Sequence, residues 1–523
     1  MQKPFQKLAK AAGAFFLVLA CVVSAAAQVT TGNVAGTVTD PQGAAVPGAE
    51  VTLTVKSTGQ SQTQQTSDAG EFRFSNLQPG EYSIAIKAQN FKALTLTDVR
   101  VSLGQTTDVP AQLTIGLQGE TVEVSAAGTE LVDTTTTTLT KSFNERQVVE
   151  LAQTGVSSTG GVNNLALIAP NVTSSGGVGV GTGGSVGGQR PRNNNFMLDG
   201  IDNNDKSVTG PQSYISPEEV AEFTLIQNQF SAEFGRSNGG QFLTVTKSGT
   251  NDYHGSFYGF FRNRYLNALD NLQKQAGVTR NRSDGDNFMP RDDFFRGGAN
   301  FGGPIPIPNW TGDDRMFWSG KDKLFFFTSY ERLQFGKAAS AGGISAPTAA
   351  GYATLAALPG VRGTNLSVLQ QFLPAAATAN AGTIEYCRIN ASIETCPAAQ
   401  ISTIPVGNIT FPSPNYQKQN HVVGNVDYNQ NASTQYHFRF TMTNLADIDT
   451  AASLPIFFSP VPSKQRLFSA TMLHNFNEST INEARIAFRR SSQNFPVPGF
   501  SFPGLDTFPN LDLDDLGLSI GPD

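Results

Sequence analysis

The sequence predicts a mainly β protein of several domains that ends in the first strands of an antiparallel transmembrane β-barrel. Three observations support this fold class. The chain has 523 residues, which is too long for one ordinary domain. From residue 32, short runs with alternating apolar residues are separated by Gly- and Pro-rich turns. From residue 253, such runs carry aromatic side chains on one face and polar side chains on the other.

Composition excludes several classes of protein. Charged residues make up 15% of the chain and the net charge is −6, without a long basic run, so we expect no nucleic-acid partner. Aromatic residues make up 10%, with 37 phenylalanines, which is too many for a disordered chain. No paired zinc ligands and no Ser/His/Asp arrangement stand out. We therefore expect neither an enzyme nor a bound cofactor.

The N-terminus has the pattern of a secretory signal peptide. Three lysines within the first ten residues precede the apolar run 11–23, and the small residues 25–27 follow it. We predict a cleaved signal over 1–27 and an exported protein. A membrane anchor is the alternative, although the run is short for a spanning helix. A lipoprotein cleavage site at Cys21 is a second alternative.

Two cysteines remain once the signal is removed, Cys387 and Cys396. In an oxidising compartment this pair predicts one local disulfide that closes a small loop, with two free thiols as the alternative. A metal site would need more ligands, and the nearest histidine, His421, is distant in sequence.

The first module reads as a small antiparallel sandwich over 32–115. The stretches "GTVTDPQGAAVPGAEVTL" and "TSDAGEFRFSNLQPGEYSIAIKAQNFK" resemble the carboxypeptidase regulatory-like domain, a prealbumin-like sandwich of the carbohydrate-binding-like fold group. We assign residues 28–116 to this module. No H-E-x-x-H motif occurs and none of the four histidines lies in it, so the resemblance implies an accessory role. We favour a spacer, with glycan binding as the alternative.

The final module shows its clearest signal in the hairpin formed by 421–428 and 434–444. In the second run, Tyr436, Phe438 and Phe440 share one face, while His437 and Arg439 share the other. Strands of about ten residues with one apolar face and tight turns are typical of a transmembrane hairpin. The alternative is a soluble sandwich with a buried aromatic face.

Five further runs bring the number of candidate barrel strands to seven. They are residues 255–263, 293–303, 323–335, 466–476 and 482–490. A long loop over 337–415 contrasts with short turns such as 429–432, and this asymmetry also fits an outer-membrane barrel.

The region before the barrel resembles the plug domain of TonB-dependent receptors. The resemblance rests on Leu198, Asp199, Gly200 and Ile201, on an acidic helix start in "ISPEEVAEF" (215–223), and on a strand that ends near Ser248. It implies a small mixed α/β plug over 129–250. The carboxylates of "LDGIDNND" (198–205) also suggest Ca²⁺ ligands, but they lack the alternating loop pattern, so we favour an Asp/Asn-rich turn.

A linker over 117–128 joins the sandwich to the plug. Within it, one β-prone segment resembles the TonB box, which pairs as an added strand with the energy-transducing protein TonB. This TonB-box-like segment consists of Glu120, Thr121, Val122, Glu123, Val124, Ser125 and Ala126.

Together, the order of signal, sandwich, plug and barrel resembles the Oar-like TonB-dependent transporter family. The resemblance implies a substrate receptor in the outer membrane, in contact with lipid and with the TonB complex, and a periplasmic sandwich. The substrate is not identified, and carbohydrate is one candidate. An exported glycan-binding or adhesion protein is the alternative. Because such barrels close with 22 strands, we expect residues 251–523 to form an incomplete barrel in a C-terminally truncated fragment.

Overall fold

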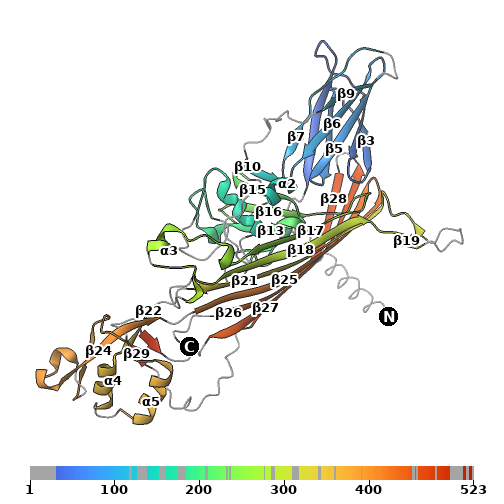
Figure 1. Ribbon diagram of the computed structural model, residues 1–523. Helices are drawn as coiled ribbons and strands as arrows, with labels where there is room; N and C mark the ends of the chain where they lie inside the picture. Colours follow the sequence, from blue (N-terminus) through green and yellow to red (C-terminus); the bar gives the residue numbers. More distant parts are fainter. Residues whose placement is uncertain are drawn as a thin grey trace, which may run out of the picture.

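The computed structural model consists mainly of β-strands arranged in a sandwich, a central unit and a long curved sheet (Figure 1). The structure describes residues 31–494, 511–513 and 518–520, apart from 117–120, 126–137, 152–160, 175–183, 206–209, 231–233, 235–236, 276, 284–288, 309–316, 340–342, 359–360, 390–391, 411–412, 450–453, 455–457 and 478–479. The predicted signal peptide therefore lies outside the described residues. No helix among the described residues is long and apolar enough to cross a membrane.

The N-terminal unit, called the sandwich below, packs two sheets face to face. One sheet has the order β4–β1–β7, with β8 also pairing with β1, and the other has the order β3–β2–β5–β6–β9. The strands are β1 (Gly32–Thr39), β2 (Glu50–Val55), β3 (Ser61–Gln65), β4 (Glu71–Leu77), β5 (Gly80–Lys87), β6 (Ala93–Val101), β7 (Thr106–Asp108), β8 (Ala111–Gln112) and β9 (Thr121–Ser125). Every second side chain faces the partner sheet, so Val51, Leu53, Ile84 and Ile86 are buried in one core.

The central unit, called the plug below, is built on a five-stranded sheet of order β10–β15–β16–β13–β14. Its elements are β10 (Leu139–Asn144), α2 (Glu145–Glu150), η1 (Gly161–Ile168), β11 (Val172–Thr173), β12 (Ser185–Val186), η2 (Pro191–Asn193), β13 (Asn195–Leu198), β14 (Ile201–Asp202), η3 (Pro217–Glu219), β15 (Val220–Asn228) and β16 (Gln241–Thr246). Phe143 stacks on Phe223 in its core, and Phe242 packs against Phe223 at a tilt. Helix α2 begins with a capping box between Asn144 and Gln147.

The prediction of a helix in 215–223 is wrong. Ser216 and Glu219 do form a capping box, but the helical segment is the single 3₁₀ turn η3, and the chain continues as β15. The residues after Glu219 include Val220, Phe223 and Thr224, which favour strands. Strand β15 lies between β10 and β16 and is hydrogen-bonded to both, so tertiary pairing overrides the local helix signal.

The C-terminal unit, called the wall below, is a seven-stranded antiparallel sheet of order β17–β18–β21–β25–β26–β27–β28. Its strands are β17 (His254–Arg262), β18 (Asp292–Pro304), β21 (Leu324–Ala339), β25 (Ser413–Asn431), β26 (Thr434–Asp449), β27 (Ser459–Asn477) and β28 (Thr480–Gln493). The plug lies on one face of the wall, and the sandwich lies at one end of its strands (Figure 1). All seven predicted strands occur, and several are longer than predicted. The turn expected at 429–432 is also displaced, because β25 continues through Asn431.

The connections between wall strands differ at the two ends of the sheet. Connections 305–323, 432–433 and 478–479 lie at the sandwich end, and β19 (Ile307–Pro308) pairs with β20 (Phe317–Trp318) in the first. Connections 263–291, 340–412 and 450–458 lie at the opposite end. Two of the three connections at the sandwich end are two-residue turns, whereas 305–323 is longer, and the longest connection, 340–412, lies at the opposite end. Short turns mainly at one end and the longest loops at the other are typical of outer-membrane barrels.

The longest connection, 340–412, contains a small folded unit. A sheet of order β22–β24–β23 packs with helix α4, and Tyr352, Leu369 and Leu373 are buried there. The elements are β22 (Gly343–Pro347), α4 (Ala349–Ala356), α5 (Gly363–Phe372), β23 (Thr383–Cys387) and β24 (Ile401–Thr410). Cys387 and Cys396 are joined by a disulfide in this unit.

Candidate functional site

The two faces of the wall differ in polarity, as the alternation in the sequence predicted. In β26, His437, Arg439 and Thr441 point toward the plug and are less than 10% exposed, whereas Phe438 and Phe440 point away and are 40% and 39% exposed. The same alternation buries His421, Asn425 and Asp427 in β25. A period of two in a strand produces this segregation directly. The wall therefore presents aromatic side chains outward and polar side chains to the plug.

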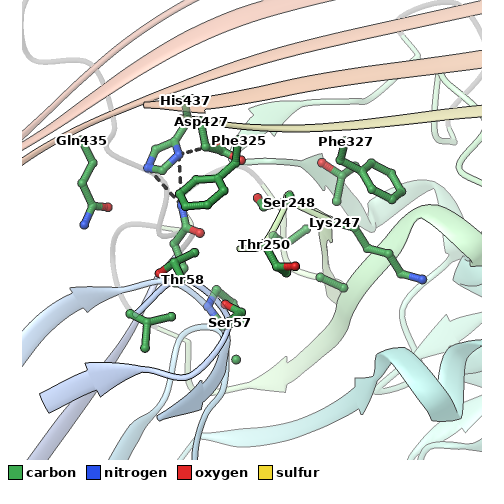
Figure 2. Close-up of a pocket in the computed structure, with 18 of the residues that line it drawn as sticks. Ser57, Thr58, Lys247, Ser248, Thr250, Phe325, Phe327, Asp427, Gln435 and His437 are labelled. Atoms are coloured by element: carbon green, nitrogen blue, oxygen red, sulfur yellow. Dashed lines mark hydrogen bonds and ion pairs between the residues drawn. The ribbon is translucent and has the colours of Figure 1, made fainter. Parts of the chain in front are cut away.

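A cavity of about 420 Å³ lies where the sandwich, the plug and the wall meet. Figure 2 shows Ser57 and Thr58 of the sandwich on one side of it, and Asp427, Gln435 and His437 of the wall on the other. The turn that leads from plug to wall, residues 247–250, forms part of its lining. The cavity therefore borders all three units.

A buried ion-pair cluster in this junction joins the wall to both other units. Asp427 Oδ1 accepts a hydrogen bond from Arg439 Nη1 at 2.6 Å and lies 2.7 Å from His437 Nδ1. Arg439 Nη2 donates to Ser248 Oγ at 3.1 Å, and Gln78 of the sandwich contacts the His437 ring at 3.0 Å. Burial of these charges is tolerated because each is paired.

A second cluster anchors the one-turn helix η3 to the wall. Glu331 Oε2 accepts hydrogen bonds from Ser216 Oγ at 2.6 Å, from Tyr258 at 2.8 Å and from Arg296 Nε at 2.8 Å. Arg296 also lies 3.8 Å from Glu218. The residue that caps η3 therefore also bonds to the wall.

A third set of contacts holds the neighbouring part of the plug. Glu219 Oε1 lies 2.8 Å from His421 Nε2. Asn425 Nδ2 donates to Thr246 Oγ1 at 2.8 Å and to the Lys247 carbonyl at 2.7 Å. Hydrogen bonds and ion pairs, unlike apolar packing, can be exchanged for bonds to water when two surfaces separate.

The predicted plug motif forms a tight hairpin turn between β13 and β14. Asp199 and Gly200 both have positive φ, +48° and +72°, as expected of an Asp–Gly hairpin turn. Asp199 accepts hydrogen bonds from the Thr246 N–H and hydroxyl, both at 2.9 Å. Burial raises the pKa of the Asp199 carboxyl, and the nearby Arg439 charge opposes this shift.

The turn and the last residue of this hairpin contact β28, which lies at one edge of the wall. Arg485 donates to the Gly200 carbonyl, and Arg489 Nη1 donates to the Asp202 carbonyl at 2.7 Å. Leu198 and Ile201 are buried in the plug. No group of three or more His, Cys, Asp or Glu residues in the described part of the chain is arranged to hold a metal ion.

Strand β9 contains the described part of the TonB-box-like segment. Residues Thr121 to Ser125 pair in parallel with Ala93 to Thr97 of β6, so the segment is an edge strand of the sandwich. Glu120 and Ala126 lie outside the described residues. The structure thus places this segment on the sandwich, away from the plug motif and from the disulfide.

Sequence reasoning missed the residues that join the three units. Glu331 and Arg296 were not singled out as candidates, and Ser216 was expected only to cap a helix. The available signal was the polar residue at every second position of the aromatic strands, which marks the inner face but not the individual partners.

Comparison with known proteins identifies the family. The model of the outer membrane beta barrel domain matches residues 245–518, more than half of the chain, so the chain belongs to the outer membrane beta barrel domain family. The model of the carboxypeptidase regulatory-like domain matches residues 33–114.

Among curated proteins, the chain is similar to the TonB-dependent transporter Oar of Myxococcus xanthus. The two are 29% identical over 311 residues, which cover 58% of this chain and 27% of the relative. The chain therefore spans about a quarter of the length of this relative. The predicted resemblance and the predicted mainly β fold class are confirmed.

Two solved structures were also found to be similar. The outer membrane transporter YddB from Escherichia coli is 11% identical, with a TM-score of 0.39, and the match covers 68% of this chain and 39% of that one. The siderophore receptor PirA from Acinetobacter baumannii is 12% identical, with a TM-score of 0.39, and the match covers 68% and 40%.

Proposed function

We propose that this chain is part of an outer-membrane transporter that binds a substrate and imports it through a plugged β-barrel, driven by TonB. The observation that carries the proposal is the contact between plug and wall. The plug blocks the polar face of the wall through buried ion pairs and hydrogen bonds, which a pull can break and water can replace. The similarity to a TonB-dependent transporter supports the source of that pull.

The proposal assigns a role and a location to each segment. Residues 1–27 direct export, residues 28–116 form a periplasmic sandwich, and 117–128 are the linker that contains the TonB-box-like segment. Residues 129–250 are the plug, and 251–523 belong to the barrel in the outer membrane. The sandwich lies at the end of the wall that has both two-residue turns, and in such barrels the end with short turns faces the periplasm. In this proposal no residue has a catalytic role.

The partner assignment is tested by the binding of the purified TonB C-terminal domain to the full-length protein. We expect deletion of 120–126 to abolish binding, because β-augmentation depends on the backbone of the added strand. Val122→Pro, which removes one backbone N–H, should weaken binding strongly, and Val122→Thr should not. Unchanged binding by the deletion variant would refute the assignment.

Transport is tested in cells by the accessibility of a buried plug residue. Thr224 is fully buried in β15, so a cysteine at this position should react with a maleimide probe only when the plug rearranges. We expect labelling of Thr224→Cys in energised cells with TonB and little labelling without TonB. Equal labelling in both strains would contradict TonB-driven rearrangement of the plug.

A further inference from the structure

The turn after β6 carries a sandwich side chain into the plug. Leu103 is 1% exposed and packs with Met197, Ile226, Phe234 and Leu243 of the plug, and it is not part of the sandwich core. Gly104, at φ +68°, follows it in the turn and would bring an added Cβ to 3.7 Å from Ile226. The sandwich is therefore docked on the plug through an apolar side chain, beyond the spacing role expected from its sequence.

Polar contacts also hold the sandwich and the plug together at this turn. The Leu103 N–H donates to Glu222 Oε1 at 2.8 Å, and Arg100 Nη2 lies 3.6 Å from Glu222 Oε2. Glu222 belongs to β15, which is hydrogen-bonded to β10 on one side and to β16 on the other. The sandwich thus contacts a central strand of the plug sheet. We call the contact of Leu103 and Arg100 with the plug the clasp.

Strand β6 joins the clasp to the TonB-box-like segment. Five residue pairs connect β6 to β9, and Val122 of β9 packs against the sandwich core. Ser125 Oγ donates to Asp98 Oδ2 at 2.7 Å, and Asp98 is also paired with Lys56. The strand that holds β9 along its edge therefore leads directly into the clasp.

Two routes connect β9 to the plug, one covalent and one through packed side chains. The covalent route runs through residues 126–138, thirteen residues that can extend to about 45 Å. The route through β6 and the clasp consists of groups already in contact. A pull on β9 therefore loads the clasp directly, whereas force along the covalent route reaches β10 only through these thirteen residues.

The sandwich also contacts the wall, but through bonds that are easier to replace. Gln78 contacts His437, Gln60 accepts from Gln435, and Asn251 donates to the Thr58 carbonyl. These are polar contacts in partly exposed positions, which water can substitute. The apolar Leu103 has no such substitute.

We propose that the sandwich is a mechanical coupler, which transmits a pull on residues 121–125 to plug strand β15 through Leu103, Arg100 and Glu222. This inference rests on the proposed function, because it needs a partner that pulls on that segment. It assigns the sandwich a role in opening the plug, and it makes the clasp the first point of the plug to bear the force.

The test is single-molecule force spectroscopy of the full-length protein in a lipid bilayer, pulled through Glu123→Cys on the exposed face of β9. In the otherwise unchanged protein, the first plug extension event should occur while β9 is still paired with β6. In Leu103→Asp, which places a charge in the apolar pocket, that event should move to a longer extension, by at most the reach of about 45 Å of residues 126–138. Arg100→Ala should lower the force at which sandwich and plug separate.

Two variants serve as controls. Leu103→Met conserves volume and should leave the event in place, as should Gln78→Ala, which affects only a wall contact. The sandwich core does not contain Leu103, so Leu103→Asp should leave that core folded. The coupler is refuted if the first plug event has the same position in Leu103→Asp and the unchanged protein. No TonB is present in this experiment, so its failure is distinct from a failure of the proposed function.

Discussion

Glu222 is a buried carboxyl group at the contact between sandwich and plug. Burial raises the pKa of its carboxyl, and the Leu103 N–H, the Arg100 guanidinium and the Thr224 hydroxyl offset part of this shift. If the sandwich undocks, water reaches the carboxyl and its pKa falls toward the ordinary value. The docked state therefore binds a proton at Glu222 more tightly than the undocked state.

This difference predicts that docking depends on pH. The contribution of Glu222 to docking is fully present below the ordinary carboxyl pKa and is lost as the pH rises through the raised pKa of the docked form. Hydrogen exchange at the Leu103 amide should therefore become faster relative to its intrinsic rate over that range. Glu222→Gln cannot titrate and should abolish the dependence. The same dependence in Glu222→Gln would show that another group is responsible.

Asp199 gives a second prediction at the scale of a residue. Asp199→Ala leaves the Thr246 N–H without its acceptor, which should cost about 1–3 kcal/mol in the local opening free energy of this part of the plug. Asp199→Asn keeps an acceptor and tolerates positive φ, so its effect should be smaller. Hydrogen exchange at the Thr246 amide measures both, and equal effects would exclude the lost acceptor as the cause.

Individual partners were the least predictable feature of the sequence. Alternation indicated that His437 and Arg439 share the inner face, but not that Asp427 joins them, since the pairing depends on the register of β25 with β26. Leu103 reads as an ordinary turn residue, because its burial depends on a surface that a separate unit supplies.

The wall strands show how far a pattern can predict an element. The seven strands were found because aromatic and polar residues alternate with a period of two. Their full length could not be predicted, because strands such as β25 continue by pairing beyond the aromatic run. A helix was wrongly predicted in 215–223, because the N-terminal cap is followed by only one helical turn.

The outward aromatic face gives a prediction for these elements. Phe440 lies outward on β26 and is 39% exposed, so in the proposed barrel Phe440→Arg would place a charge against lipid. We expect this variant of the full-length protein to be less stable in bilayers by about 2–4 kcal/mol if the site lies near the midplane. Phe440→Leu is the control. Equal stability of the two variants in a denaturant titration would contradict a lipid-facing surface.

At the scale of the whole molecule, the order of sandwich, plug and wall was predictable, because each unit has its own sequence pattern. The docking between units was not predictable, since neither surface carries a pattern that names its partner. The sequence therefore suggested a spacer, whereas the structure places the sandwich in direct contact with a central plug strand.

The proposed transport function requires that the wall is part of a membrane barrel. The measurement that tests it most directly is fractionation of cells that express the full-length protein, followed by gel electrophoresis of heated and unheated outer-membrane samples. We predict that the protein is found in the outer-membrane fraction and that its band shifts on heating, as a closed barrel unfolds. A soluble periplasmic or secreted protein without a shift would contradict the transporter and favour an exported binding protein.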